Sequence, residues 1–349
     1  MNKKVTNRIS EILVPTEEQK ERMLSNILDE HKNETAKKRS YMPMKRLKPV
    51  LAAATVVFCL ITTTAFAASY LGLDIKFINF LNPSSNEQSE YLASGAYVVD
   101  KQIKNKNGTL DIKQVIGDSN ATLILMDFTA PEETVLDKPH YSFDDMYIDV
   151  IGNHGFIGYG IIALEDENIN DNKISMVMRI NNRDSFMGKK IHLKFTDLQW
   201  ADTRPGEFTT IVPGEWEARF NLDFRNCSTT YEVNKNVTVY GYEAILKTIS
   251  ISPISVALNL DSKYISDIVG ASEDWEAENR EVLSLNEHSD IYPITINYND
   301  GTRETTAVLK GLRSMGTDGI WFIKNFENVI NYKEIKSITF FDAEIQIPH

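Results

Sequence analysis

Trp216-Glu-Ala-Arg-Phe-Asn-Leu-Asp-Phe224 is the stretch that decides the fold class of this chain. Hydrophobic residues stand at every second position from Trp216 to Phe224, and charged or polar residues stand between them. Successive side chains of a β-strand point to opposite faces, so this alternation is typical of a strand with one buried and one solvated face. The stretch therefore predicts a sheet.

Similar signals lie on both sides of this strand. Residues 191–196 alternate in the same way, and Ala121–Phe128 is a continuous apolar run, typical of a strand buried on both faces. Asn107-Gly108 and Asp300-Gly301 are turn signals that predict hairpins. Many short strands with turns between them indicate a mainly β protein of β-sandwich architecture.

The predicted strands divide into two domains, with the break near Cys227–Asn234. We expect a first β domain over residues 74–229 and a second β-sandwich domain over residues 230–349. The acidic segment Ser262–Glu287 is expected to form a long loop or a short helix inserted in the second domain.

Upstream of these strands lies an uncharged stretch, Pro49–Leu73, that contains no Asp, Glu, Lys, Arg or His. A helix of this length would extend about 37 Å, whereas the hydrocarbon core of a bilayer is roughly 30 Å thick. The stretch predicts a transmembrane helix over residues 49–73. Its small residues, such as Ala53, Ala54, Ala65 and Ala68, would let two spans approach closely, which makes a homodimer one candidate assembly.

Charge is distributed unevenly around this stretch. The first 48 residues carry 12 basic and 7 acidic side chains, a net charge of +5, while the remainder carries −17. Basic flanks stay on the cytoplasmic side of a membrane, so residues 1–48 are predicted to be cytoplasmic and the β domains to lie outside the cell membrane. The acidic exterior portion does not suit nucleic-acid binding.

Two other interpretations of the uncharged stretch remain open. Ala65-Phe66-Ala67 has the small-x-small form of a signal-peptide cleavage site, although a preceding region of 48 residues is long for a signal peptide. A buried core helix is the other interpretation, and the lack of a polar face argues against it.

The N-terminal arm has the pattern of an amphipathic helix. Thr16 is a predicted N-cap with Gln19 at the capping-box position. The arm is too short to bury apolar stripes in a core of its own, so we expect them to bind a partner protein, a second copy or the membrane surface. The candidate partner-binding residues are Ile9, Ile12, Leu13, Met23, Leu24, Ile27 and Leu28.

No catalytic, cofactor-binding or metal-binding pattern stands out. The six histidines are not paired at a metal-ligand spacing, and there is no Gly-x-Ser-x-Gly turn. The two cysteines, Cys59 and Cys227, lie on opposite sides of the predicted membrane boundary, which argues against a disulfide between them. The sequence therefore predicts a protein that is not an enzyme and needs no cofactor.

The whole arrangement resembles a known family. The features are a helical N-terminus with a Glu-rich start (Pro15–Leu28), a basic flank, one span, and exterior segments that include 193–200, 213–220, 241–245 and 251–254. A Gly-x-Trp-x-x-x-Phe strand followed by a Ser-Pro-containing strand is the most specific part. The chain resembles the single-pass membrane proteins of Gram-positive bacteria that act as anti-sigma regulators of extracytoplasmic-function sigma factors.

This resemblance implies immunoglobulin-like exterior domains that sense an envelope condition or ligand, and a cytoplasmic arm that sequesters a sigma factor. The zinc-binding His and Cys cluster of one large anti-sigma class is absent, because the arm has only His31 and no cysteine. The alternative is a cell-envelope binding or adhesion protein with no signalling role.

Overall fold

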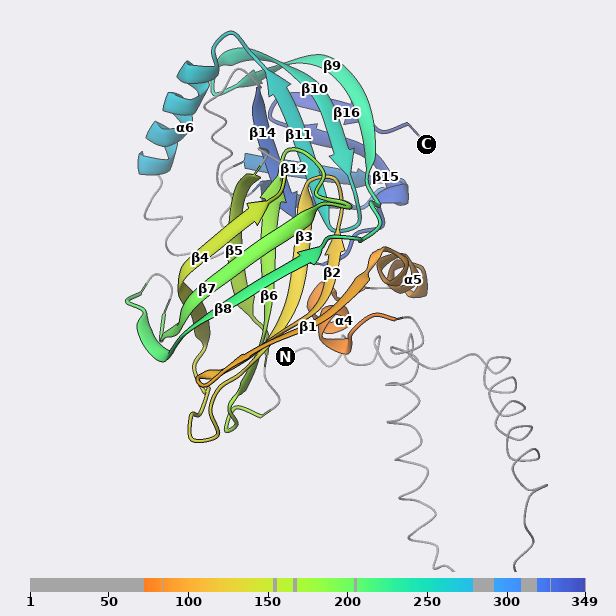
Figure 1. Cartoon of the computed structure of the whole chain (residues 1–349). Helices are drawn as coiled ribbons and strands as arrows, with labels where there is room; N and C mark the ends of the chain where they lie inside the picture. The colour runs from red at the N-terminus through yellow and green to blue at the C-terminus, as the bar shows by residue number, and fades with distance from the viewer. Residues whose placement is uncertain are drawn as a thin grey trace, which may run out of the picture.

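The computed structural model describes residues 72–83, 85–152, 156–165, 168–203, 206–278, 292–308, 319–326 and 328–348. Strands dominate these residues and pair antiparallel in several sheets (Figure 1). The prediction of a mainly β fold is confirmed. The predicted arm, 1–48, and all of the predicted span except Gly72 and Leu73 lie outside the described residues.

The first group of strands follows two short helices. The elements are α4 (Ile75–Leu81), α5 (Asn86–Gly95), β1 (Tyr97–Asn105), β2 (Gly108–Gly117), β3 (Ala121–Thr129), β4 (His140–Val150), β5 (Phe156–Ala163), β6 (Lys173–Asn182), β7 (Lys190–Ala201) and β8 (Thr209–Asn221). They form one sheet with the order β1-β2-β3-β6-β5 and another with the order β4-β7-β8.

The alternating stretch that predicts a sheet lies in β8 and just beyond it. Trp216, Ala218 and Phe220 are buried, while the residues between them are exposed. The Trp216 ring meets Phe128 of β3 edge-on, with the ring centroids 4.9 Å apart. Both sheets therefore contribute to one buried hydrophobic cluster, which accounts for the period of two in the sequence.

Strand β3 is buried on both faces, as its apolar run predicts. Ile124, Met126 and Phe128 face the core shared with the other sheet. Leu123 and Leu125 point the opposite way, into a cluster that includes residues of α4 and α5. The helices therefore cover the outer face of the larger sheet.

The second group of strands occupies the rest of the described chain. Its elements are β9 (Thr229–Val239), β10 (Tyr242–Ile251), β11 (Ser255–Asp261), α6 (Ile265–Glu278), β12 (Tyr292–Tyr298), β13 (Arg303–Val308), β14 (Ile320–Asn325), η1 (Tyr332–Glu334), β15 (Ile335–Phe340) and β16 (Ala343–Gln346). The sheet orders are β14-β11-β10-β9 and β13-β12-β15-β16, and their inner faces share a second hydrophobic cluster. For the segment 262–287, where either a long loop or a short helix is expected, the described residues form helix α6.

Both predicted hairpins are confirmed. Asn105 pairs with Gly108 across the first turn, so the two connecting residues are Lys106 and Asn107. A Cβ on Gly108 would lie 2.7 Å from the backbone oxygen of Thr129, so no side chain fits there. In the second hairpin, between β12 and β13, the Asp300 carboxylate accepts a hydrogen bond from the Thr302 N–H at 2.8 Å.

Candidate functional site

The described chain begins in a segment that the first group of strands holds firmly. The buried Gln114 side chain of β2 donates a hydrogen bond to the Gly72 carbonyl oxygen and accepts one from the Asp74 N–H at 2.7 Å. Leu73 lies between these two contacts and is 3% exposed. Asp74 then caps α4 by accepting a hydrogen bond from the Lys76 N–H at 2.9 Å. One amide thus fixes the path of the backbone into the helix.

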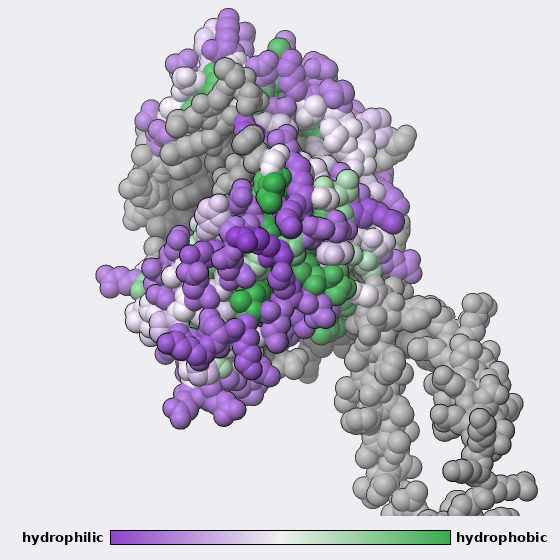
Figure 2. All heavy atoms as spheres, viewed as in Figure 1, coloured by the Kyte–Doolittle hydropathy of each residue, from purple (hydrophilic) through white to green (hydrophobic). Residues whose placement is uncertain are grey.

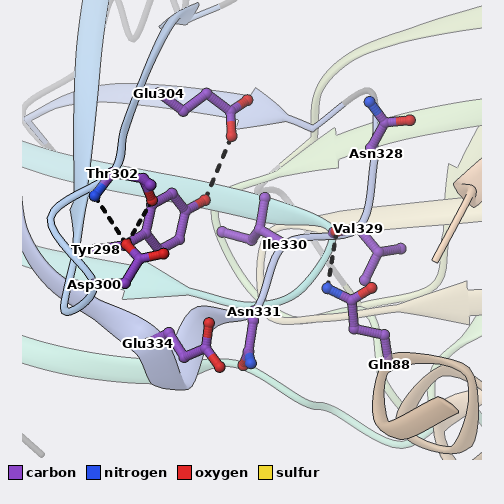
Figure 3. A pocket seen from close by; sticks show the side chains of 10 residues that line it. All are labelled: Gln88, Tyr298, Asp300, Thr302, Glu304, Asn328, Val329, Ile330, Asn331 and Glu334. Atoms are coloured by element: carbon purple, nitrogen blue, oxygen red, sulfur yellow. Dashed lines mark hydrogen bonds between the residues drawn. The ribbon is translucent and has the colours of Figure 1, made fainter. Parts of the chain in front are cut away.

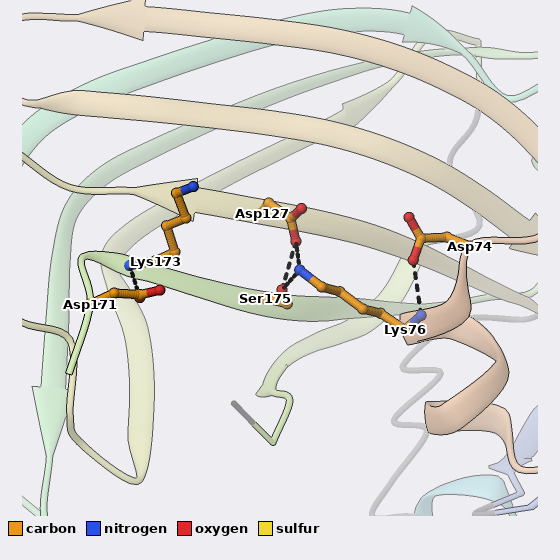
Figure 4. A network of polar contacts seen from close by, with 6 residues as sticks. All are labelled: Asp74, Lys76, Asp127, Asp171, Lys173 and Ser175. Atoms are coloured by element: carbon orange, nitrogen blue, oxygen red, sulfur yellow. Dashed lines mark hydrogen bonds and ion pairs between the residues drawn. The ribbon is translucent and has the colours of Figure 1, made fainter. Parts of the chain in front are cut away.

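A polar network fixes the first turn of α4 to the larger sheet (Figure 4). The Lys76 ammonium donates hydrogen bonds to the Asp127 carboxylate of β3 and the Ser175 hydroxyl of β6. Ser175 in turn donates to Asp127 at 2.7 Å. The Lys76 side chain is 45% exposed, so solvent screens the ion pair and its contribution to stability is at most about 1 kcal/mol. The network orients the helix more than it stabilises the fold.

The apolar side of α4 lies where the two groups of strands meet. Phe77 and Leu81 belong to one buried cluster with Ile254 and Val329 of the second group. The Val329 N–H donates to the Leu81 carbonyl oxygen at 2.9 Å. Asn82, the C-cap of α4, donates from its side chain to the Asn328 side chain at 3.0 Å. The segment 72–82 is therefore in contact with both groups of strands.

A second contact between the two groups of strands is a buried carboxyl. Asp118, in the turn between β2 and β3, is 1% exposed and accepts hydrogen bonds from the N–H groups of Asn120 and Ala121 at 2.7 Å. Its other oxygen accepts hydrogen bonds from the hydroxyls of Ser252 and Ser255, which flank the turn between β10 and β11. We name these three side chains, Asp118, Ser252 and Ser255, the junction lock.

Burial raises the pKa of Asp118, and the four donated hydrogen bonds oppose this shift only in part. Next to the lock, burial raises the pKa of the Cys227 thiol to about 12. That thiol therefore remains protonated at neutral pH, which does not suit a nucleophile.

A shallow hollow of about 360 Å³ opens beside the junction (Figure 3). Its lining is mostly polar and acidic: Gln88, Tyr298, Asp300, Thr302, Glu304, Asn328, Val329, Ile330, Asn331 and Glu334. Gln88 of α5 donates to the Val329 carbonyl oxygen at 3.2 Å, so the first group also contributes to this wall.

The chemistry of the hollow is limited. Burial and the nearby Glu304 raise the pKa of Tyr298, while hydrogen bonds from Thr302 lower the pKa of Asp300. Asp300, Glu304 and Glu334 are exposed to solvent. Within the described part of the chain, no three His, Cys, Asp or Glu side chains are grouped closely enough to hold a metal ion.

An apolar patch lies near the start of the described chain. Figure 2 shows hydrophobic side chains gathered on an otherwise hydrophilic face, where α4 and the start of β1 lie in Figure 1. Ile75 of α4 and Val98 of β1 are 50% and 57% exposed. This patch therefore includes part of the segment that follows the predicted span.

The residues predicted to bind a partner all lie outside the described residues. They are Ile9, Ile12, Leu13, Met23, Leu24, Ile27 and Leu28. The helices of the described segments include none that is long and apolar enough to cross a membrane.

Sequence reasoning missed both Gln114 and the junction lock. Lys113 and Gln114 stand together between the apolar Ile112 and Val115–Ile116, and this break in the alternation of the strand was the available signal. The Asp118–Ser119–Asn120 run is a turn signal, but it does not reveal a partner 137 residues away in sequence.

Comparison with known proteins gives no family assignment. No model of a known family matches the sequence, and no curated protein sequence matches it. A crystal structure of a conserved domain protein from Bacillus anthracis is similar, with a TM-score of 0.46 and 13% sequence identity. The similarity covers 70% of this chain and 75% of that one.

Proposed function

We propose that the chain is a single-pass membrane regulatory protein, an anti-sigma factor that sequesters a sigma factor through its cytoplasmic arm. The exterior strands would form two immunoglobulin-like β-sandwiches that sense the envelope. No cofactor, catalytic group or nucleic acid takes part in this proposal. Membrane lipid and a sigma factor are the proposed partners, with an envelope ligand as the signal.

The uncharged stretch of residues 49–73 is the observation that carries this proposal. It separates a basic arm with apolar stripes from an acidic, β-rich portion. A protein with this order of parts connects two compartments. An arm that is too short to bury its apolar residues in a core of its own is expected to bind a partner through them.

Membrane topology is the first test. A thiol at Met187, which is 47% exposed, should react with a membrane-impermeant maleimide on intact cells. A thiol at Ser25 should react only after lysis. Met187→Cys and Ser25→Cys in a background without native thiols, Cys59→Ser with Cys227→Ser, make a matched pair. Equal labelling of both thiols on intact cells would contradict the topology.

Sigma-factor capture is the second test. The full chain in detergent should retain an extracytoplasmic-function sigma factor from the same organism in a pull-down. Replacing Met23, Leu24, Ile27 and Leu28 together with Asp should abolish capture, because the apolar stripe is lost. Lys20→Asp with Arg22→Asp alters the arm outside this stripe and is the control. Capture that survives the fourfold change would refute the proposed binding surface.

An envelope-binding or adhesion protein without signalling is the second candidate. The open, acid-lined hollow beside the junction favours it, because such a surface attracts cationic groups. The two candidates differ in the arm. Deleting residues 1–40 would remove sigma-factor capture in the first case and leave envelope binding unchanged in the second.

A further inference from the structure

Residues 72–82, which we name the strap, contact both groups of strands at the point where the chain leaves the predicted span. The first group holds the start of the strap through Gln114 and the Lys76 network (Figure 4). The second group holds its end through Val329 and Asn328. Moving one group relative to the other therefore has to break contacts at one end of the strap.

The contacts of the second group with the strap are direct hydrogen bonds and apolar contacts. Among the described residues, they are one backbone hydrogen bond from Val329, one side-chain hydrogen bond from Asn328, and the apolar contacts of Val329 and Ile254. These contacts persist only while the second group stays in place. The junction lock supplies a separate restraint on that position, because both of its hydroxyl donors come from the turn between β10 and β11.

The turn that carries the lock also connects directly to the residues that touch the strap. The Ile330 N–H donates to the Pro253 carbonyl oxygen at 3.0 Å, and the Phe326 N–H donates to the Ile254 carbonyl oxygen at 2.9 Å. Residues 252–255, Phe326 and residues 328–330 are thus one hydrogen-bonded unit. A shift of this turn away from Asp118 would carry Val329 away from Leu81.

We infer that the strap couples the two groups of strands to the predicted span, so that opening the junction lock releases the end of the strap from the second group. The coupling runs through the hydrogen-bonded unit of residues 252–255, Phe326 and residues 328–330, which has the lock at one side and the strap at the other. This inference deepens the proposed function, since it describes how an exterior event reaches the membrane.

Hydrogen exchange of the full-length protein in detergent tests this coupling. Ser255→Ala removes one hydroxyl donor from the lock and does not touch the strap. We expect the N–H groups of Val329 and Asn82 to exchange at least tenfold faster in this variant. The Asp74 N–H, which Gln114 holds from the first group, should change less than threefold.

Two further variants make the result decisive. Asp118→Ala removes all four hydrogen bonds of the carboxyl and should produce the same pattern with a larger increase. Ser250→Ala is the control, because Ser250 is also buried in β10 but its hydroxyl accepts a hydrogen bond from Thr230 of the same group. It should leave exchange at Asn82 and Val329 unchanged.

Two outcomes would overturn the inference. In the first, exchange at Asn120 and Ala121 rises in Asp118→Ala while Asn82 and Val329 stay protected. In the second, Ser250→Ala raises exchange at the strap as much as Ser255→Ala, which would indicate general destabilisation. Neither readout involves the cytoplasmic arm, so failure here is separate from a failure of sigma-factor capture.

Discussion

Replacing Asp118 by Asn should change how the stability of the protein depends on pH. Burial raises the pKa of this carboxyl in the folded protein above its value of about 3.9 in an unfolded chain. The folded state then binds the proton more tightly than the unfolded state does. The carboxyl stabilises the fold fully below pH 4, and this contribution is lost as the pH rises through the folded-state pKa.

The structure gives the physical basis for this direction. Asp118 is 1% exposed, and its four hydrogen-bond donors are two peptide N–H groups and two neutral hydroxyls. In the described part of the chain no cation pairs with it. A protonated Asp118 would donate to the Ser255 hydroxyl, because Ser252 already accepts the N–H groups of Ile254 and Ser255.

The expected magnitude follows from the linkage of one proton to unfolding. Between the two pKa values, the stability of wild type relative to Asp118→Asn should fall by at most about 1.4 kcal/mol per pH unit. Asn keeps an oxygen to accept from Asn120 and Ala121, so the variant should remain folded. Urea unfolding of the full chain in detergent, followed by tryptophan fluorescence at pH values from 4 to 7, measures the difference.

The opposite sign would refute this prediction. If the four donors held the carboxylate ionised, wild type would gain stability relative to the variant as the pH rises, and the gain would be complete above about pH 5. Asp111→Asn removes one negative charge from the same sheet, at a half-buried carboxyl that accepts from the Gln102 side chain, and controls for net charge.

Two further predictions concern the core of the first group of strands. Trp216→Ala should destabilise this group by about 3–5 kcal/mol, because the fully buried ring leaves a cavity, whereas the half-buried Trp200→Ala should cost about 1–2 kcal/mol in the same urea titration. Gly117→Ala should cost about 1–3 kcal/mol, since its Cβ would lie 2.5 Å from a buried phenylalanine ring. Gly158→Ala has open space at this position and should change stability by less than about 0.5 kcal/mol, and equal effects at the two glycines would contradict the packing described here.

Local patterns in the sequence were sufficient to predict several of the strands, such as β3, β7 and β8. The period of two around Trp216 depends only on which face of one strand is buried, and that information lies within nine residues. The hairpin at Asp300-Gly301 is equally local, since its carboxylate and its glycine both act within the turn. The mainly β fold could therefore be predicted without knowledge of how the sheets pack.

The junction could not be predicted in the same way. Gln88 and Val329 are 241 residues apart in sequence, and Asp118 and Ser255 are 137 apart. A polar side chain in a turn is usually exposed, so nothing local marks Asp118 as buried. Only the meeting of two turns from different groups of strands removes it from solvent.

The contacts at this junction determine how much free energy is needed to open it. Each group of strands has its own apolar cluster, and opening either cluster would expose large side chains to water. The junction combines a smaller apolar cluster, which includes Ile254 and Val329, with a carboxyl, hydroxyls and amides, which water can solvate when the contact opens. Opening the junction therefore costs less free energy than unfolding either group of strands. If an exterior signal moves part of this protein, we expect the hydrogen bonds at the junction and at the end of the strap to break before either group of strands unfolds.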